Sequence, residues 1–333
     1  MKKILLMLCF AVLINIAKAQ YLADVLGNNI EFQTIQMPAD ASDSIVCTIV
    51  RKQASSKTNR AVLYVHGFCD YFFNVEMAEK FTAQGIDFYA VDLRKYGRSL
   101  LPGQMPNICR NLSEYFADID TCLSIIKTEG HTDVSIIAHS TGGLTTALYA
   151  DAKPNNPLYQ RIILNSPFLD MNQSWFMENI VVPVVSFLGR FFPNMPLPKG
   201  LAGWYGQSIH KDFKGEWDYN LTWKPIEAFQ MDAGWLHAIH QGHKKVQKGL
   251  NIDKPILLMH SDKTVVSETW TEDYRIGDGV LDVEDIHTYG LKLGKDVQES
   301  TIKAGLHDLS LSSKDIRENY YQAIFEWLGS KTK

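Results

Sequence analysis

The sequence predicts an α/β fold with a mostly parallel central sheet, helices on both faces and an inserted helical cap. Short apolar runs with the length of buried strands recur along the chain, and amphipathic helical patterns lie between most of the later runs. One long interval interrupts this alternation. The chain has 333 residues, of which 46% are hydrophobic, so it is long enough for one large domain with a substantial core.

Residues 1–19 have the pattern of a secretory signal peptide. Lys2 and Lys3 precede an uncharged apolar run over residues 4–16, and Ala17-Lys18-Ala19 offers the small residues of a cleavage site. The apolar run is too short to span a bilayer. We therefore expect an exported protein, periplasmic or extracellular, that is soluble after cleavage behind Ala19, and a single mature domain over residues 20–333.

The mature chain is expected to be acidic and poor in cysteine. Without residues 1–19 it carries 30 basic and 37 acidic side chains and has no basic run, which argues against nucleic-acid binding. The remaining cysteines lack the spacing of a metal site, so we expect mostly buried thiols, no metal and no cofactor. They are Cys47, Cys69, Cys109 and Cys122, of which Cys69 lies beside a predicted catalytic loop.

The strands and helices are predicted in the following order. Residues 30–36 and 45–50 are successive strand-like runs without a helix between them, which indicates an antiparallel hairpin. The runs that follow alternate with helical patterns and are expected to form parallel strands. These strands are predicted at 61–65, 87–91, 134–138, 161–164, 255–259 and 297–302, and the helices at about 74–84, 112–128, 142–152 and 316–329.

The interval between Asn165 and Pro255 is far longer than an ordinary connection, and we expect a structured cap over residues 171–250. Its most apolar part runs from Trp175 to Pro193. Pro183 and Gly189 interrupt any single straight helix there, which argues against a membrane span. The apolar face of this run either packs against the core, or it lines an acyl pocket or touches lipid.

The stretch from Val134 to Gly143 carries the strongest indication of function. An apolar run ends in Ser140, and a helical pattern starts immediately after it. A turn this tight leaves no room for large side chains two places before and after the serine, and Ala138 and Gly142 occupy those places. This pattern predicts a nucleophilic serine, although a serine that merely caps the helix is an alternative.

Segments before and after Ser140 supply the other parts of an acyl-transfer site. The strand at 61–65 leads into His66-Gly67-Phe68, and the loop there can present a backbone N–H to an oxyanion. We assign the two oxyanion donors to the N–H groups of Phe68 and Thr141. The last strand leads into a loop with His307, which is the expected general base.

The acid that orients His307 has three candidates. Asp262 closely follows the strand at 255–259, but the usual acid position there is occupied by Thr264. A helix, a strand and their loops between acid and histidine take about 25–30 residues. Asp278 lies 29 residues before His307 and Asp262 lies 45 before it. We therefore prefer Asp278, with Asp262 second and Asp282 third.

Four motifs carry a resemblance to a known family. They are His66-Gly67-Phe68, Asp92-x-Arg94-x-x-Gly97-Arg98-Ser99, Ala138-His139-Ser140-Thr141-Gly142-Gly143 and Gly305-Leu306-His307-Asp308. Through them the chain resembles the α/β-hydrolase superfamily, and within it the group of monoglyceride lipases, lysophospholipases and serine aminopeptidases. It departs from that group at Ala138, Lys95 and Thr264.

The resemblance and the order of the motifs imply a secreted serine hydrolase that works through a Ser-His-Asp triad and an acyl-enzyme. The expected substrate is a small acyl ester or lipid, such as a monoacylglycerol or lysophospholipid, with transient contact between the cap and a lipid surface. A serine aminopeptidase is the alternative, and Glu178, Glu216 or Asp218 of the cap would then bind the free α-amine. A non-catalytic binding protein that retains the hydrolase shell is the third hypothesis.

Overall fold

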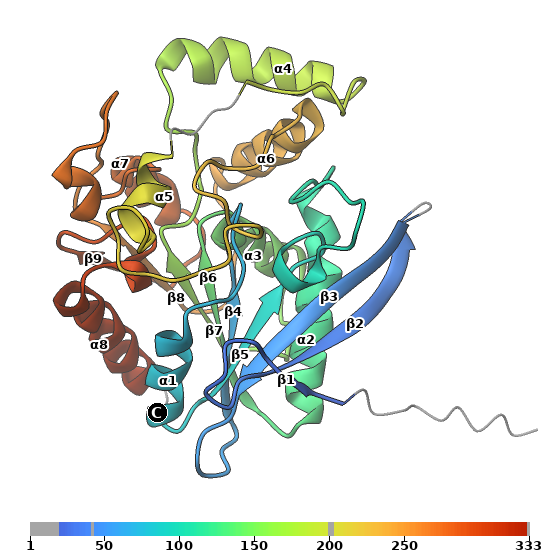
Figure 1. Cartoon of the computed structure of the whole chain (residues 1–333), viewed down its shortest axis with the longest axis vertical. Coiled ribbons are helices and arrows are strands. Elements are labelled where there is room, and N and C mark those ends of the chain that lie inside the picture. Colours follow the sequence, from blue (N-terminus) through green and yellow to red (C-terminus); the bar gives the residue numbers. More distant parts are fainter. Residues whose placement is uncertain (1–19, 41–42, 199–202, 332–333) are drawn as a thin grey trace, which may run out of the picture.

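The computed structural model describes residues 20–40, 43–198 and 203–331 (Figure 1). The expected signal peptide, residues 1–19, lies outside the described residues. Within the described ranges, no helix combines the length and the apolar character needed to cross a membrane.

The strands of the described chain form one sheet in the order β1-β2-β3-β5-β4-β6-β7-β8-β9. The pairs β1–β2, β2–β3 and β3–β5 are antiparallel. The remaining pairs, from β5–β4 to β8–β9 in the strand order, are parallel. The predicted hairpin and the mostly parallel sheet are thereby confirmed. The strands are β1 (Leu22–Ala23), β2 (Glu31–Asp40), β3 (Asp43–Lys52), β4 (Arg60–Val65), β5 (Asp87–Asp92), β6 (Asp133–His139), β7 (Arg161–Asn165), β8 (Ile256–Ser261) and β9 (Val297–Ile302).

Helices cover both faces of the sheet (Figure 1). On one face, α1 (Val75–Ala83) and α8 (Lys314–Ser330) bury Phe81 and Ile324 in one apolar cluster. On the other, α2 (Phe116–Thr128) and α3 (Thr141–Ala152) bury Leu123 and Leu144 in a second cluster. Because both faces are covered, the central strands are apolar on both sides, as the sequence pattern predicts. The remaining helix of the core is α7 (Val283–Gly290), and short helical turns occur at η1 (Gly97–Ser99), η2 (Leu112–Tyr115), η4 (Glu272–Arg275) and η5 (Leu309–Leu311).

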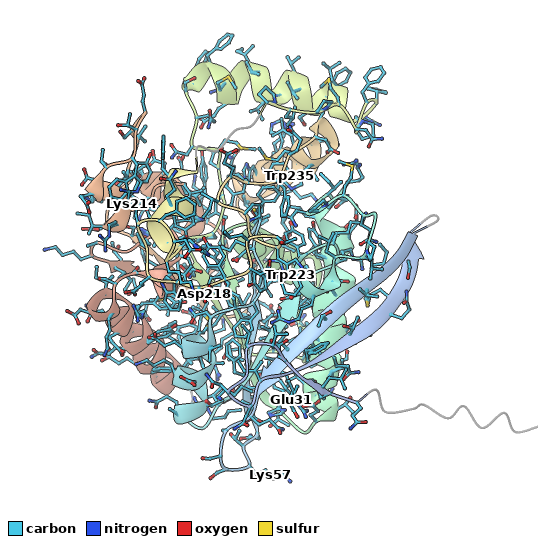
Figure 2. All side chains as sticks on the ribbon, viewed as in Figure 1. Glu31, Lys57, Lys214, Asp218, Trp223 and Trp235 are labelled. Carbon is cyan, nitrogen blue, oxygen red and sulfur yellow. The ribbon has the colours of Figure 1, made fainter. Side chains whose placement is uncertain are left out.

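The cap lies between β7 and β8, within the interval that the sequence indicates. It contains the π-helical turn η3 (Met177–Val181), α4 (Val182–Gly189), α5 (Trp204–Ile209) and α6 (Ala233–Val246). In Figure 1, α4 crosses the top of the molecule and α6 lies beneath it. The two helices approach closely at Gly189, where a Cβ would lie 2.0 Å from the carbonyl oxygen of Ala233. Trp235 of α6, labelled in Figure 2, belongs to the main buried cluster, so the last cap helix is also part of the core.

Candidate active site

Ser140 occupies a strained turn between β6 and α3. Its backbone angles, φ 52° and ψ −119°, lie in a region that residues other than glycine rarely adopt. The Ser140 N–H donates to the carbonyl oxygen of Asn165 at 3.1 Å, and its own carbonyl accepts the N–H of Phe168 at 3.0 Å. A Cβ on Gly142 would lie 2.3 Å from the carbonyl oxygen of His66. The small residue after the serine is therefore a steric requirement, as the motif predicts.

Three predicted side chains meet in one hydrogen-bonded series. His307 Nε2 lies 3.0 Å from Ser140 Oγ, and His307 Nδ1 lies 2.9 Å from Asp278 Oδ2. The loop after β9 carries His307, and the segment before α7 carries Asp278, so three distant parts of the sequence contribute one residue each. Both His307 and Asp278 are buried. In this arrangement the carboxylate holds the imidazole so that Nε2 can accept the serine proton.

A backbone pairing explains why Asp278 rather than Asp262 reaches His307. The chain leaves β8, passes Thr264, loops outward and returns so that Asp278 pairs with Thr264 in a short parallel bridge. In that bridge the Asp278 N–H donates to the Lys263 carbonyl at 2.9 Å, and its carbonyl accepts the Val265 N–H at 2.7 Å. The bridge therefore places Asp278 beside Thr264, the residue at the usual acid position in the sequence.

The two other candidate acids have structural partners of their own. Asp262 is exposed, and its Oδ1 accepts the Ala304 N–H at 2.7 Å. Asp282 caps α7 by accepting the Glu284 N–H at 3.0 Å, and it also accepts the Thr264 hydroxyl at 3.1 Å. Neither carboxylate contacts His307.

The two assigned oxyanion donors flank Ser140. Thr141 is the first residue of α3, where N–H groups have no intrahelical acceptor, and Phe68 lies on the loop after β4. Among the described residues, neither backbone N–H has an acceptor. Both residues line the same cavity as Ser140 and His307. This placement fits the predicted role of holding a negatively charged oxygen.

A group of buried ionisable side chains lies beside His307. The ligand-type atoms of Asp70, His139 and Asp308 all lie within 4.8 Å of one another, which is the only group of the described residues with the spacing to hold a metal ion. Asp70 Oδ1 already accepts a charge-assisted hydrogen bond from Lys224 Nζ at 2.7 Å. Burial lowers the pKa of His139 to about 4, so the imidazole next to His307 is neutral at pH 7.

A cavity of about 620 Å³ opens onto Ser140 and His307. Most of its wall is apolar and comes from the cap. The apolar wall includes Phe168, Met177, Val181, Val182, Val185, Leu197, Met231, Trp235 and Leu236. Asp70 and Lys224 are the charged side chains of the wall apart from histidines, and they neutralise each other. The cavity thus suits an uncharged, elongated apolar group beside the nucleophile.

Three predicted amine-binding residues lie away from this cavity. Glu216 pairs with Arg317, and Asp218, labelled in Figure 2, pairs with Lys211 on the surface. Glu178 is on η3, but its Oε1 accepts the N–H of Gln173 and it does not line the cavity. The aminopeptidase alternative would use these carboxylates to bind an α-amine, but in the structure each carboxylate contacts another partner.

Sequence reasoning missed the Asp70–Lys224 pair. The sequence offered one indication of Asp70, since this carboxylate lies two residues after the predicted oxyanion donor Phe68. It offered none of Lys224, which reaches Asp70 only because the cap folds over the core. Cys47, Cys69, Cys109 and Cys122 are all buried free thiols, in agreement with the expectation. Burial also raises the pKa of the Cys69 thiol to about 11, which makes it a poor nucleophile.

Comparisons with known proteins agree with this architecture. Residues 56–273 match the model of the Hydrolase_4 family, described as serine aminopeptidase, S33. A monoacylglycerol lipase from Mycolicibacterium smegmatis is 26% identical over 205 residues, which are 61% of this chain and 69% of that protein.

Solved structures show the same fold. The crystal structure of a monoacylglycerol lipase from Paleococcus ferrophilus has a TM-score of 0.64 and 20% identity, over 85% of this chain and 98% of that one. A soluble variant of the monoglyceride lipase from Saccharomyces cerevisiae, in complex with a substrate analog, has a TM-score of 0.65 and 18% identity over 95% and 96%. These likenesses show an α/β-hydrolase fold.

Proposed function

Because this chain belongs to the Hydrolase_4 family of serine aminopeptidase (S33) type and is a serine hydrolase, we propose that it hydrolyses carboxylic esters of apolar acyl chains. Monoacylglycerols and lysophospholipids are the proposed substrates. The observation that carries the proposal is the hydrogen-bonded series Asp278–His307–Ser140 at the wall of a largely apolar cavity. The residues that form the series supply the nucleophile, the base and the orienting acid of acyl transfer.

The reaction follows from the distances in the site. His307 Nε2, 3.0 Å from Ser140 Oγ, takes the hydroxyl proton as the oxygen attacks the ester carbonyl. The carbonyl oxygen becomes an oxyanion that the N–H groups of Phe68 and Thr141 hold. His307 then gives its proton to the departing alcohol oxygen, which leaves an acyl-Ser140 ester. Water, deprotonated by His307, attacks this ester and releases the carboxylic acid and the free serine.

The cavity wall supports an acyl chain over an aminoacyl group. A free α-amine needs an unpaired carboxylate close to the nucleophile, and the one carboxylate in the wall among the described residues, Asp70, is already paired with Lys224. An alkyl chain needs only apolar surface, which the cap residues provide. Burial of each methylene contributes about 0.8 kcal/mol, so binding should strengthen with chain length until the cavity is full.

A substrate panel tests the proposal. We expect p-nitrophenyl esters of graded chain length, and monoacylglycerols and lysophospholipids, to be hydrolysed with a kcat/KM that rises with chain length, and aminoacyl p-nitroanilides to be inert. A fluorophosphonate probe should label the wild type and not Ser140→Ala. If the folded wild type is not labelled, the proposed serine-hydrolase mechanism is refuted. If the anilides are cleaved faster than the esters, the aminopeptidase alternative is favoured.

We further propose that the cap contacts lipid surfaces. Several large apolar side chains at the outer edge of the cap are exposed: Trp175 (71%), Phe187 (61%), Phe191 (59%) and Phe192 (64%). Phe187 and Phe191 also lie together, with ring centroids 5.4 Å apart. Exposed apolar side chains gathered in this way are unusual unless they meet lipid or another protein. The surface lies on the cap that also walls the cavity, so an acyl chain leaving a lipid layer would enter close to it.

Vesicle sedimentation tests the lipid contact. Phe187→Ser/Phe191→Ser should reduce binding to phosphatidylcholine vesicles severalfold while hydrolysis of a short, water-soluble ester stays unchanged, because neither residue lines the cavity. A matched control is Val266→Ser, which removes an exposed apolar side chain (81%) far along the sequence from the cap. Equal vesicle binding by all three proteins would refute the proposal.

Export is the remaining proposal, and it is supported by the sequence of residues 1–19. Expression of the full chain in a Gram-negative host should yield protein in the periplasm or medium that begins at Gln20. Mass spectrometry of the intact product measures this directly. Retention of residues 1–19 on the purified protein would contradict it.

A further inference from the structure

The cap and the loop that carries an oxyanion donor are joined by one buried ion pair. Lys224 Nζ lies 2.7 Å from Asp70 Oδ1, and the side chains are 9% and 2% exposed. Asp70 is two residues beyond Phe68 on the loop after β4, whereas Lys224 belongs to the cap segment between α5 and α6. A buried charge pair with this separation in sequence fixes two segments relative to each other.

Aromatic contacts place the same two segments against each other. The N–H of Asn220 in the cap donates to the hydroxyl of Tyr71 at 2.8 Å, and the Tyr71 ring meets Trp223 edge-on with centroids 5.1 Å apart. Figure 2 shows Trp223 in the middle of the molecule, well below α4. Phe73 packs on Tyr219 with centroids 4.9 Å apart. Each contact joins loop 70–73 to cap segment 219–224.

Cys69, which precedes Asp70 in the loop after β4, has a strained backbone conformation. Cys69 has a φ of 52°, which a residue with a side chain adopts only when its surroundings hold it there. Its N–H donates to Asn107 Oδ1 at 3.1 Å. The amide of Phe68 is thus placed by a strained turn that is held on one side by Asn107 and on the other by the Asp70–Lys224 pair.

We propose that Lys224 is a positioning residue, which acts through Asp70 to hold the Phe68 amide at the oxyanion position and so makes catalysis depend on the seated cap. The inference rests on the proposed function and adds a residue to it. Without Lys224, Asp70 would remain as an uncompensated buried carboxylate close to Asp308. The carboxylate would then move toward water and carry the loop with it.

The expected effect is on turnover and not on substrate binding. Loss of an oxyanion donor lowers kcat by about 10²–10³-fold, so a donor that is displaced rather than removed should lower it about tenfold or more. Lys224→Met should therefore lower kcat at least tenfold with KM within twofold. Lys224→Arg, which can still pair with Asp70, should stay within threefold of the wild type in kcat.

The measurement uses two esters with the same acyl chain, a p-nitrophenyl ester and a monoacylglycerol. A displaced oxyanion donor lowers kcat equally for both. The affinity of the matching alkyl trifluoromethyl ketone, which forms an oxyanion with Ser140, should fall in parallel with kcat. Lys211→Met is the matched control, because it breaks an exposed ion pair with Asp218 in the same cap segment and should leave the kinetics unchanged.

A double variant separates the role of the pair from a loss of folding. Lys224→Met/Asp70→Asn removes both charges of the pair, so neither is left buried without its partner and the variant should fold even where the single variant does not. Its kcat should be about three- to tenfold below the wild type because the ion pair no longer joins the two segments. A double variant with the wild-type kcat overturns the inference, even where Lys224→Met does not fold. A fall in kcat that affects only the monoacylglycerol and not the p-nitrophenyl ester also overturns the inference, because the pair would then bind the alcohol portion of the substrate. A wild type that hydrolyses neither ester refutes the proposed function instead.

Discussion

Asp278→Asn is the substitution for which the structure makes the sharpest prediction. One carboxylate oxygen, Oδ2, faces His307 Nδ1 at 2.9 Å. The other, Oδ1, accepts the N–H groups of Val280 and Leu281, each at 2.8 Å. An asparagine must place its carbonyl oxygen toward these two N–H donors, because its NH2 group cannot accept from them. The NH2 group then faces His307.

This orientation forces the wrong tautomer on the histidine. An NH2 donor opposite Nδ1 requires Nδ1 to be unprotonated, so the ring proton moves to Nε2. Nε2 then cannot accept the proton of Ser140 Oγ. In a triad of this type the same exchange lowers kcat about 10⁴-fold with little change in geometry. At about 1.4 kcal/mol per tenfold, the loss is about 5.5 kcal/mol of transition-state stabilisation.

The assay is hydrolysis of a p-nitrophenyl ester by wild type, Asp278→Asn, Asp262→Asn and Asp282→Asn, together with thermal melting. Asp262→Asn should keep kcat within about twofold, since Asp262 is exposed and contacts Ala304. Asp282→Asn should change neither the melting temperature nor kcat appreciably, because an asparagine Oδ1 can accept the same hydrogen bonds from Glu284 and Thr264. If Asp278→Asn keeps more than a tenth of the wild-type kcat, or Asp262→Asn loses as much, the assignment of the acid is wrong.

Three further outcomes follow from the same contacts. Gly142→Ala places a Cβ 2.3 Å from the His66 carbonyl oxygen, so it should lose about 1–3 kcal/mol or more of stability by denaturant unfolding, whereas Gly329→Ala, where a Cβ meets no atom within 4 Å, should be tolerated. Burial first, and nearby carboxylates second, raise the pKa of Asp285 from 3.8 to about 6, so stability present below pH 4 is lost as the pH rises through 6. Asp285→Asn should therefore raise the melting temperature at pH 8 and leave it unchanged at pH 4. Cys69 lines the cavity, but its pKa is raised to about 11, so it should react with iodoacetamide at pH 8 far more slowly in the native protein than after unfolding, and equal rates in the two states would contradict the raised pKa.

Most of the fold could be predicted because it rests on short-range patterns. A buried parallel strand needs a run of apolar residues, and a helix that covers it needs an apolar stripe. The predicted strand at 297–302 and helix at 316–329 correspond to β9 and to α8 (Lys314–Ser330) almost residue for residue. The strand β1 has only two residues, too few to carry such a pattern, and among the described residues it pairs with β2 alone, so the sequence does not predict it.

The cap illustrates the limit of this reasoning. Its extent follows from a long interval between strands, but the sequence left open whether its apolar run faces the core, the pocket or the exterior. All three apply to parts of it: Val182 lines the cavity, Gly189 approaches α6, and Phe187 is exposed. A helix with apolar residues around its whole circumference has no single preferred face, so only packing assigns one.

The sequence by itself predicted the nucleophile, the base and the alternation of strands with helices, because each leaves a pattern in a short stretch of chain. Ser140 is identified by a turn whose small neighbours are a local steric demand, and His307 by its place after the last strand. Only the tertiary structure decided which aspartate meets His307 and which cation meets Asp70. Asp278 and Lys224 reach their partners through loops that fold back over long stretches of chain, and no local pattern encodes that approach.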